Sequence, residues 1–324
     1  MENLKNYVKN YINKYINESI WDIEDNVDDN NEEMVKGEIL KFLDEFYFCE
    51  QRFKNTVPSQ TVQITTNKNQ IIVNCHCSVH TANDITVLTN GLFEWGEVKG
   101  DFNCSGSLKL ESLEGAPETV GGDFNCTNCP NLKTLEGAPK WVGEYFTCSD
   151  SKYLESLEGG PEYAGHFICD RCPIKTLEGG PKKVNGEFNC DRCPELKSLK
   201  GGPEYVGGSF SCCCCKKLES LEGAPERVDG DFDCSGNPIL KSLKGASKTV
   251  KGNFICSDCP ITSLEGAPEE VGVSFMCHDC TKLESLKGAP KKVSHNFDCR
   301  RCPNLHSLDG VGKVKGKIFS TLKT

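Results

Sequence analysis

A repeat of 21 or 22 residues governs the sequence from about residue 85 to the carboxyl end. Each repeat has a phenylalanine two residues before a cysteine, and a leucine follows eight or nine residues after that cysteine. The phenylalanines are Phe102, Phe124, Phe146, Phe167, Phe188, Phe210, Phe232, Phe254, Phe275 and Phe297, and Phe319 continues the series where the cysteine has become Thr321. So short a period predicts a solenoid, in which each repeat buries its apolar face only against its neighbours.

The Phe-x-Cys spacing predicts one short β-strand per repeat. Residues two apart on a strand point to the same face, so the phenylalanine and the cysteine face inward together. Little of the repeat remains for a helix, and the Glu-Gly-Ala-Pro segment after the leucine opposes one, because proline lacks an amide donor. We therefore expect a parallel sheet of about ten or eleven strands, about 4.8 Å apart, with return limbs of turns and extended chain.

The form Phe-x-Cys-x-x-Cys-x-x-Leu-x-Ser-Leu resembles the Leu-x-Leu-x-x-Asn/Cys-x-Leu segment of leucine-rich repeats. In the rung of Phe232, Asn237 stands where that family has its asparagine. The complete repeat, with Leu-x-Ser-Leu-Glu-Gly-Ala-Pro ahead of Val-x-Gly-x-Phe-x-Cys, looks like the arrays of large DNA viruses and tailed phages. The resemblance implies a leucine-rich-repeat-like solenoid that serves as a protein-binding scaffold.

The 22 cysteines allow three interpretations. Seven rungs contain Cys-x-x-Cys, a spacing that fits zinc sites and could also form disulfides within a rung. Three rungs replace the second cysteine by Ser107, Ser151 or Asn237, and a zinc site would not survive that loss. We favour packing as small buried side chains, with zinc and disulfides as alternatives, and we expect no metal or cofactor. In the four-cysteine run, Cys213 and Cys214 should be the most exposed thiols.

The chain divides into two expected domains, an α+β capping unit at 1–84 and the solenoid at 85–324. Residues 1–84 lack the repeat, and solenoids need a unit that covers the first rung. Apolar residues at helical spacing predict two helices, over about 4–20 and 34–46. The segment 22–33 between them is acidic and is expected to be a solvated linker.

The second half of the capping unit alternates between apolar and polar residues. This alternation, over 61–66 and 71–79, predicts two strands joined as a hairpin. On the second strand, Cys75 and Cys77 would face one way and His76 the other. The three side chains would not converge, so no metal is expected there.

The formal net charge of −10 excludes two classes of partner. An acidic chain repels phosphate backbones and anionic membranes, so we expect neither nucleic acid nor a membrane as a partner. The first residues contain no apolar leader, and no stretch approaches the ~18 apolar residues of a membrane span. We therefore expect a soluble monomer in the cytoplasm, which is the host cytoplasm if the chain is viral.

Strand residues that point away from the phenylalanine and cysteine form the exposed face, which is usually concave in such arrays. Polar residues there vary between rungs, as in Asp123, Asn125, Glu187, Asn189, Asp231 and Asp233. Aromatic, arginine and histidine side chains on or just past the strands are the candidate protein-binding residues, because such side chains are favoured binding anchors. These candidates are Tyr145, His166, Arg171, Arg192, His278, Arg300 and Arg301.

A row of charges on the return limb nearly alternates in sign from rung to rung. Stacked rungs would place opposite charges side by side, which predicts a salt-bridge ladder that fixes register. The row contains Glu118, Lys140, Glu162, Lys182, Glu204, Glu226, Lys248, Glu269 and Lys291.

Two functions of different classes fit the sequence. The first is a non-enzymatic interaction module whose exposed sheet face binds a protein. The second is an effector-like enzyme, in which the repeats select a substrate and residues 1–84 carry the chemistry with Cys49, Cys75 or Cys77 as nucleophile. We favour the first and assign no catalytic residue, because no nucleophile lies beside a histidine in a catalytic pattern and the glycines belong to repeat turns.

Overall fold

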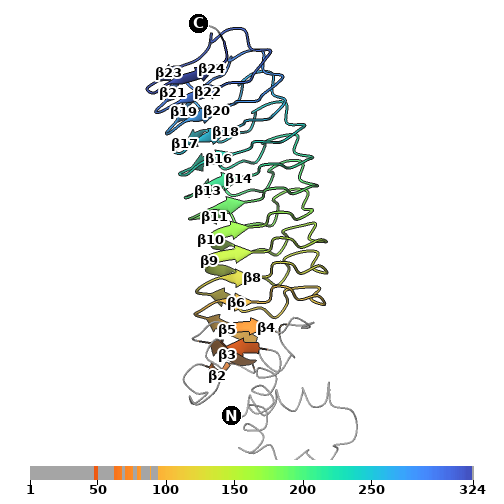
Figure 1. Ribbon diagram of the computed structural model, residues 1–324. Coiled ribbons are helices and arrows are strands. Elements are labelled where there is room, and N and C mark those ends of the chain that lie inside the picture. The colour runs from red at the N-terminus through yellow and green to blue at the C-terminus, as the bar shows by residue number, and fades with distance from the viewer. Residues whose placement is uncertain are drawn as a thin grey trace, which may run out of the picture.

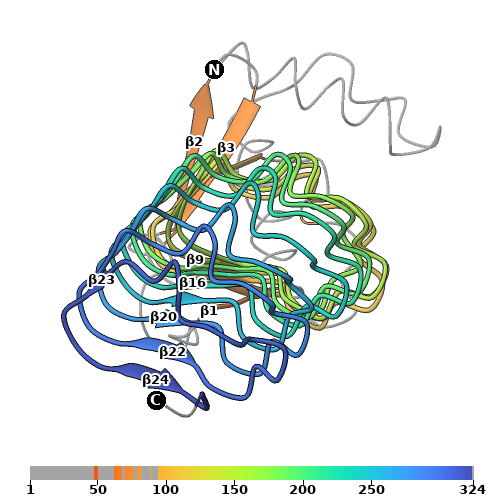
Figure 2. The same ribbon diagram turned by 90° about the horizontal axis from the view of Figure 1, so that it is seen from above.

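The structure, a computed structural model, describes residues 94–322, Leu88 and the backbone of residues 47–49, 62–67, 70–75 and 79–81. The helices predicted over 4–20 and 34–46 and the acidic linker 22–33 lie outside the described residues. The described chain is a parallel β-solenoid of about ten turns and contains no helix. Figure 1 shows the rungs stacked into an elongated rod, and in the view along the rod their outlines are gradually offset toward the carboxyl end (Figure 2).

Most rungs contribute two short strands, not the single strand that Phe-x-Cys predicted, and each strand pairs in parallel with its counterpart in the next rung. The first ladder contains β5 (Glu94–Val98), β7 (Thr119–Val120), β11 (Lys183–Val184), β13 (Tyr205–Val206), β15 (Arg227–Val228), β17 (Thr249–Val250), β19 (Glu270–Val271), β21 (Lys292–Val293) and β23 (Lys313–Val314). The second contains β6 (Phe102–Asn103), β8 (Phe124–Asn125), β12 (Phe188–Asn189), β14 (Phe210–Ser211), β16 (Phe232–Asp233), β18 (Phe254–Ile255), β20 (Phe275–Met276), β22 (Phe297–Cys299) and β24 (Ile318–Ser320). Two longer strands, β9 (Trp141–Thr147) and β10 (Tyr163–Ile168), belong to both ladders.

Four described strands precede these ladders, namely β1 (Tyr47–Cys49), β2 (Val62–Asn67), β3 (Gln70–Cys75) and β4 (Val79–Thr81). Strands β2 and β3 are antiparallel, with Asn67 opposite Gln70, which confirms the predicted hairpin, although its second strand ends at Cys75 and not at Val79. His76 and Cys77 lie outside the described residues. Strand β3 pairs in parallel with β5 and β4 with β6, whereas β1 pairs antiparallel with β4. Both ladders therefore extend across residue 84, where the sequence placed the domain boundary.

Ten phenylalanine rings form a continuous stack through the core. Every ring from Phe102 to Phe297 is fully buried, and rings of consecutive rungs lie 5.2–5.6 Å apart at interplanar angles of 8–26°. At the amino-terminal end of the stack, Trp95 meets Phe102 edge to face at 5.7 Å. Each inner ring is covered on both faces only while its two neighbouring rungs are present, so the stack couples the stability of adjacent rungs.

Phe319 does not continue this stack, contrary to the expectation from the sequence. Strand pairing places Ile318 beside Phe297, and Phe319 falls one position further on, in the outward row. The spacing explains the difference, because Phe297 follows Val293 by four residues and Ile318 follows Val314 by the same interval. The tenth ring is therefore the last in the stack.

The cysteines of the described chain are free thiols, and all of them are buried except Cys213 and Cys214. This confirms packing as small side chains and the predicted exposure of those two. The second cysteine of a rung also donates a hydrogen bond to the main-chain carbonyl of the first cysteine one rung earlier, as Cys193 Sγ does to Cys169 O at 3.3 Å. Where a rung lacks this cysteine, Ser107 donates to a carbonyl of its own rung at 2.7 Å. The position is therefore one for a small hydrogen-bonding side chain.

Asn237 fills the same position with an amide. Its Nδ2 donates to the carbonyl oxygens of Cys212, at 3.1 Å, and Cys234, at 2.7 Å. Its Oδ1 accepts the amide hydrogen of Cys215 at 2.8 Å. One fully buried side chain thus joins two rungs through three hydrogen bonds.

The predicted charge ladder forms in part. Ion pairs at 2.9–3.5 Å join Lys140 to Glu118, Lys248 to Glu226 and Lys291 to Glu269. Lys182 instead donates to the carbonyl of Gly201 at 3.2 Å. Further inter-rung pairs on the return limb join Lys175 to Glu155, Lys200 to Glu178, Lys217 to Glu195 and Lys287 to Glu265. These pairs are exposed, so they favour the correct register more than they add to stability.

We predict that Asn237→Val destabilises the solenoid by about 2–4 kcal/mol, because the buried carbonyls of Cys212 and Cys234 and the amide of Cys215 lose their hydrogen-bond partner. Asn237→Cys should cost much less, since a thiol serves in most other rungs. Urea unfolding of both variants measures the difference. Equal stability of the two variants would contradict a hydrogen-bonding role for this position.

Buried thiols also predict a steep loss of stability in alkali. Burial raises the pKa of Cys129 to about 11 and the pKa of Cys259 and Cys280 to about 12. A thiol of the unfolded chain ionises near about pH 8.5, so these groups leave stability intact below that pH and reduce it as the pH rises toward their folded values. Each such thiol lowers the free energy of unfolding by up to about 1.4 kcal/mol per pH unit in that window.

Urea titrations under reducing conditions between about pH 7.5 and about pH 9.5 test this, below the range in which tyrosine and lysine ionise. A free energy of unfolding that stays constant across that window would show that the thiols are not buried.

Candidate binding surface

The outward residues of the second ladder, here called the second-ladder face, are those before, between and just after the buried phenylalanine and cysteine of each rung. Many of them complete hydrogen bonds of the scaffold. The side chain before the phenylalanine accepts the amide hydrogen of the same position in the next rung, as Asp123 Oδ1 does from Tyr145 at 3.0 Å and Asp231 Oδ1 from Asn253 at 2.6 Å. The same bond is made by Asp101, Ser209, Asn253, Ser274 and Asn296.

The next outward position, between phenylalanine and cysteine, holds a second set of caps. Its asparagine or aspartate accepts the amide hydrogen two residues later, at 2.8–3.1 Å, which is an Asx-turn. The residues are Asn103, Asn125, Asn189, Asp233 and Asp298. The small polar residues at these two positions therefore serve to accept hydrogen bonds from backbone amides.

Strands β9 and β10 carry four outward aromatic side chains, here called the aromatic patch: Trp141 and Tyr163 in the first ladder, and Tyr145 and His166 in the second. Trp141 and Tyr163 stack at 5.6 Å with an interplanar angle of 10°, and Tyr145 and His166 stack at 4.1 Å and 14°. Trp141 is 43% exposed and Tyr145 39% exposed. The Trp141 and Tyr145 side chains make no hydrogen bond in the described chain, so burial and capping do not account for their size.

Local sequence explains the continuous strand β10 under the patch. Ala164 lies three residues before Phe167, whereas the corresponding valine of other rungs lies four before its phenylalanine. The connection between the two strands is one residue shorter in this rung, so they form one continuous strand, with a register shift between Ala164 and His166. Adjacent glycines make room for the rings, since the Trp141 tip would lie 3.0 Å from a Cβ at Gly143. A larger residue at Gly143 would also collide with the carbonyl oxygen of Gly121, so this glycine permits close stacking of the rungs as well.

His166 is held in one orientation by the following rung. Its Nδ1 accepts the amide hydrogen of Glu187 at 3.0 Å. The ring also occupies the space that a Cβ at Gly186 would need. The Tyr145–His166 pair is therefore a preorganised feature of the surface.

Three of the predicted arginines lie in a left-handed turn between the two cysteine positions. Arg171, Arg192 and Arg301 have φ of 54–57°, where other rungs use glycine, asparagine or aspartate as well as Cys214. Arg171 contacts Asp150 at 2.5 and 2.7 Å, and this hydrogen bonding lowers the pKa of that carboxyl. The Arg171 guanidinium therefore joins two rungs of the scaffold.

The other two turn arginines differ in their contacts. Arg301 binds Asp279 at 2.5 and 2.6 Å. Hydrogen bonds from Arg301 and His278 hold the pKa of Asp279 well below its usual range. Arg192 is exposed, and its guanidinium has no partner among residues 94–322.

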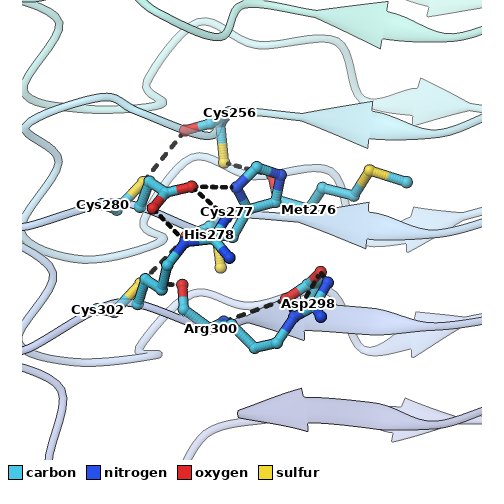
Figure 3. A network of polar contacts seen from close by, with 10 residues as sticks. Cys256, Met276, Cys277, His278, Cys280, Asp298, Arg300 and Cys302 are labelled. Atoms are coloured by element: carbon cyan, nitrogen blue, oxygen red, sulfur yellow. Dashed lines mark hydrogen bonds and ion pairs between the residues drawn. The ribbon is translucent and has the colours of Figure 1, made fainter. Parts of the chain in front are cut away.

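His278 and Arg300 belong to a network near the carboxyl end of the rod, shown in Figure 3. His278 Nδ1 lies 2.7 Å from Asp279 Oδ2, and Arg300 folds back onto Asp298 with contacts of 2.6–3.2 Å (Figure 3). Burial alone would raise the pKa of Asp298, but the hydrogen bonds from Arg300 hold it below its usual value. The Arg300 guanidinium also lies 5.1 Å from the Phe319 ring centre.

The predicted candidates thus fall into two groups. Tyr145, His166, Arg171 and Arg192 occupy three consecutive rungs, and His278, Arg300 and Arg301 lie on two rungs about 24 Å further along at the usual strand spacing. Sequence reasoning missed Trp141 and Tyr163, because it placed no strand before the glycines. The residue that precedes the repeating valine was the available signal, since it faces outward in the first ladder.

The part of the chain that the structure describes contains neither a metal-binding cluster nor a membrane-spanning helix. No group of three or more histidine, cysteine, aspartate or glutamate side chains there could hold a metal ion. Nor does that part contain a helix long and apolar enough to cross a bilayer.

Comparison with known proteins found no protein-family model, no curated protein and no solved structure that matches this chain. Function is therefore argued from the surface itself.

Proposed function

We propose that the chain is a non-enzymatic interaction scaffold, a cytoplasmic monomer that binds a protein partner on the outward surface of its strands, around the aromatic patch of β9 and β10 and the adjoining second-ladder face. The rungs would be a leucine-rich-repeat array of the type found in large DNA viruses and tailed phages. Residues 1–84 would form the α+β cap of its amino-terminal end. Pairing of β3 and β4 with the first rung supports that capping role.

The aromatic patch is the observation that carries the proposal. At the position of Tyr145, most other rungs use small polar residues that complete backbone hydrogen bonds, as Asp123 and Asp231 do. Tyr145 and, in the first ladder, Trp141 instead expose large rings that make no hydrogen bond in the described chain. Tryptophan and tyrosine are the residues most enriched among binding hot spots, because a rigid ring buries much area at little cost in side-chain entropy. Stacking on Tyr163 and His166 further restricts the two rings before a partner arrives.

The thiols of the solenoid support a non-enzymatic role. Burial raises the pKa of Cys172 and Cys215, as it does for most cysteines of the core, so the reactive thiolate is disfavoured. Their sulfur atoms donate to main-chain carbonyls of the preceding rung. These cysteines serve the fold.

A binder selection tests this function. Partners would be selected from a library of displayed protein fragments on the native chain and then measured against Trp141→Ala/Tyr145→Ala. We predict that the double variant weakens binding by at least about thirty-fold, since the removed side chains are of the hot-spot type.

Tyr153→Ala is the matched control. Tyr153 is 47% exposed, on the return limb, and its loss should leave binding unchanged. Urea midpoints of all variants should equal that of the native chain. If the partners bind the double variant as tightly as the native chain, or if the control variant weakens binding by the same factor, the aromatic patch is not the binding site.

A further inference from the structure

The second-ladder face carries an unbalanced negative charge between β8 and β16. Its outward positions there include six acids and no lysine or arginine, and the acids are Asp123, Asp170, Glu187, Asp191, Asp231 and Asp233. The next turn position adds two cations, Arg171, which pairs with Asp150 and Asp170, and the exposed Arg192. Only Asp170 has a cationic partner in the described chain, namely Arg171 at 2.5 Å. On the return limb, by contrast, lysines neutralise many of the glutamates. Within residues 94–322, this part of the second-ladder face is therefore a local concentration of carboxylates that mostly lack ion-pair partners, and it adjoins the aromatic patch.

The scaffold does not need this charge. Asp123 and Asp231 use one carboxylate oxygen each to accept the amide hydrogen of the next rung. Asn253 and Asn296 make the same bond at the same position with a neutral amide, at 3.1 and 3.0 Å. The second carboxylate oxygen of Asp123 and of Asp231 has no partner in the described chain. An amide would satisfy the fold equally well, so the negative charge at these positions is available to a partner.

The Tyr145–His166 pair lies in the same row as these acids. Asp123 occupies the rung before the pair and Glu187 the rung after it, as the hydrogen bonds from Tyr145 and Glu187 show. The carboxylates thus bracket the aromatic rings over about 14 Å of the rod. Aromatic rings attract ammonium and guanidinium groups, and nearby carboxylates strengthen that attraction. The arrangement suits a cationic side chain over the Tyr145 ring with further cations on either side.

Resting on the proposed function, we propose that the partner presents an extended segment rich in arginine or lysine to the second-ladder face. One cationic side chain contacts the Tyr145–His166 pair. Others pair with Asp123 and Glu187 and, further along, with Asp231 and Asp233. Alternate side chains of an extended segment project to one side about every 7 Å, so alternating cations can follow the row of acids.

Fluorescence anisotropy of a labelled synthetic peptide tests the proposal. The peptide consists of six Arg-Ser dipeptides, so that arginine occupies every second position. The native full-length chain should bind this peptide, more tightly at about 50 mM than at about 200 mM salt, and should not bind the glutamate–serine equivalent. Asp123→Asn/Asp231→Asn keeps the backbone hydrogen bonds and should weaken binding about tenfold. Tyr145→Ala should weaken it as well, through loss of the cation–π contact.

Glu136→Gln/Glu158→Gln removes the same number of charges from the return limb, where neither glutamate has an ion-pair partner in the described chain. This control should bind the peptide as the native chain does. No binding by the native chain, or equal weakening by both double variants, would overturn the proposal.

The fragments selected under the proposed function separate the two proposals. If the affinity of those fragments falls for Trp141→Ala/Tyr145→Ala but does not change for Asp123→Asn/Asp231→Asn, the proposed binding surface is supported and the proposed basic partner is contradicted. If their affinity is the same for the native chain and for both double variants, both proposals are contradicted.

Discussion

Parallel stacking of nearly identical rungs is the constraint on which the whole molecule depends. The strand spacing of about 4.8 Å brings each phenylalanine ring to 5.2–5.6 Å from the next, close enough for the rings to cover one another. An isolated rung would expose its ring on both faces, so burial is a property of the array. The same stacking places every other repeat position in a row along the rod, and each side chain therefore meets its own counterpart one rung away.

This row geometry separates residues that serve the fold from residues that do not. A cysteine, serine or asparagine after the turn bonds to main-chain atoms, as Cys193, Ser107 and Asn237 illustrate. In most rungs a small polar residue before the phenylalanine caps the next rung, and glycine, asparagine or aspartate suits the left-handed turn. Trp141 and Tyr145 fit none of these roles, and the charge of Asp123 exceeds what its role requires. Function is best sought where the sequence departs from what stacking demands.

The sequence predicted the solenoid, the phenylalanine stack and the buried cysteines, because a period of 21–22 residues and the Phe-x-Cys alternation act over short distances. It missed the first ladder, where each short strand has one inward residue, such as Val206, and the glycines that follow it hide the strand pattern. It assigned Phe319 to the core because residue type outweighed spacing. It also took Arg171 and Arg301 for free anchors, because their aspartate partners lie 21–22 residues away and meet them only once the turns are stacked.

Hydroxyl-radical footprinting of the chain with a bound partner tests the central claim most directly, because side-chain oxidation reports the exposure of each ring. We expect binding to suppress oxidation of Trp141 and Tyr145 while Tyr153, equally exposed on the return limb, oxidises at its free rate. Unchanged oxidation of Trp141 and Tyr145, with protection at Tyr153 instead, would show that the partner binds the return limb and would contradict the account.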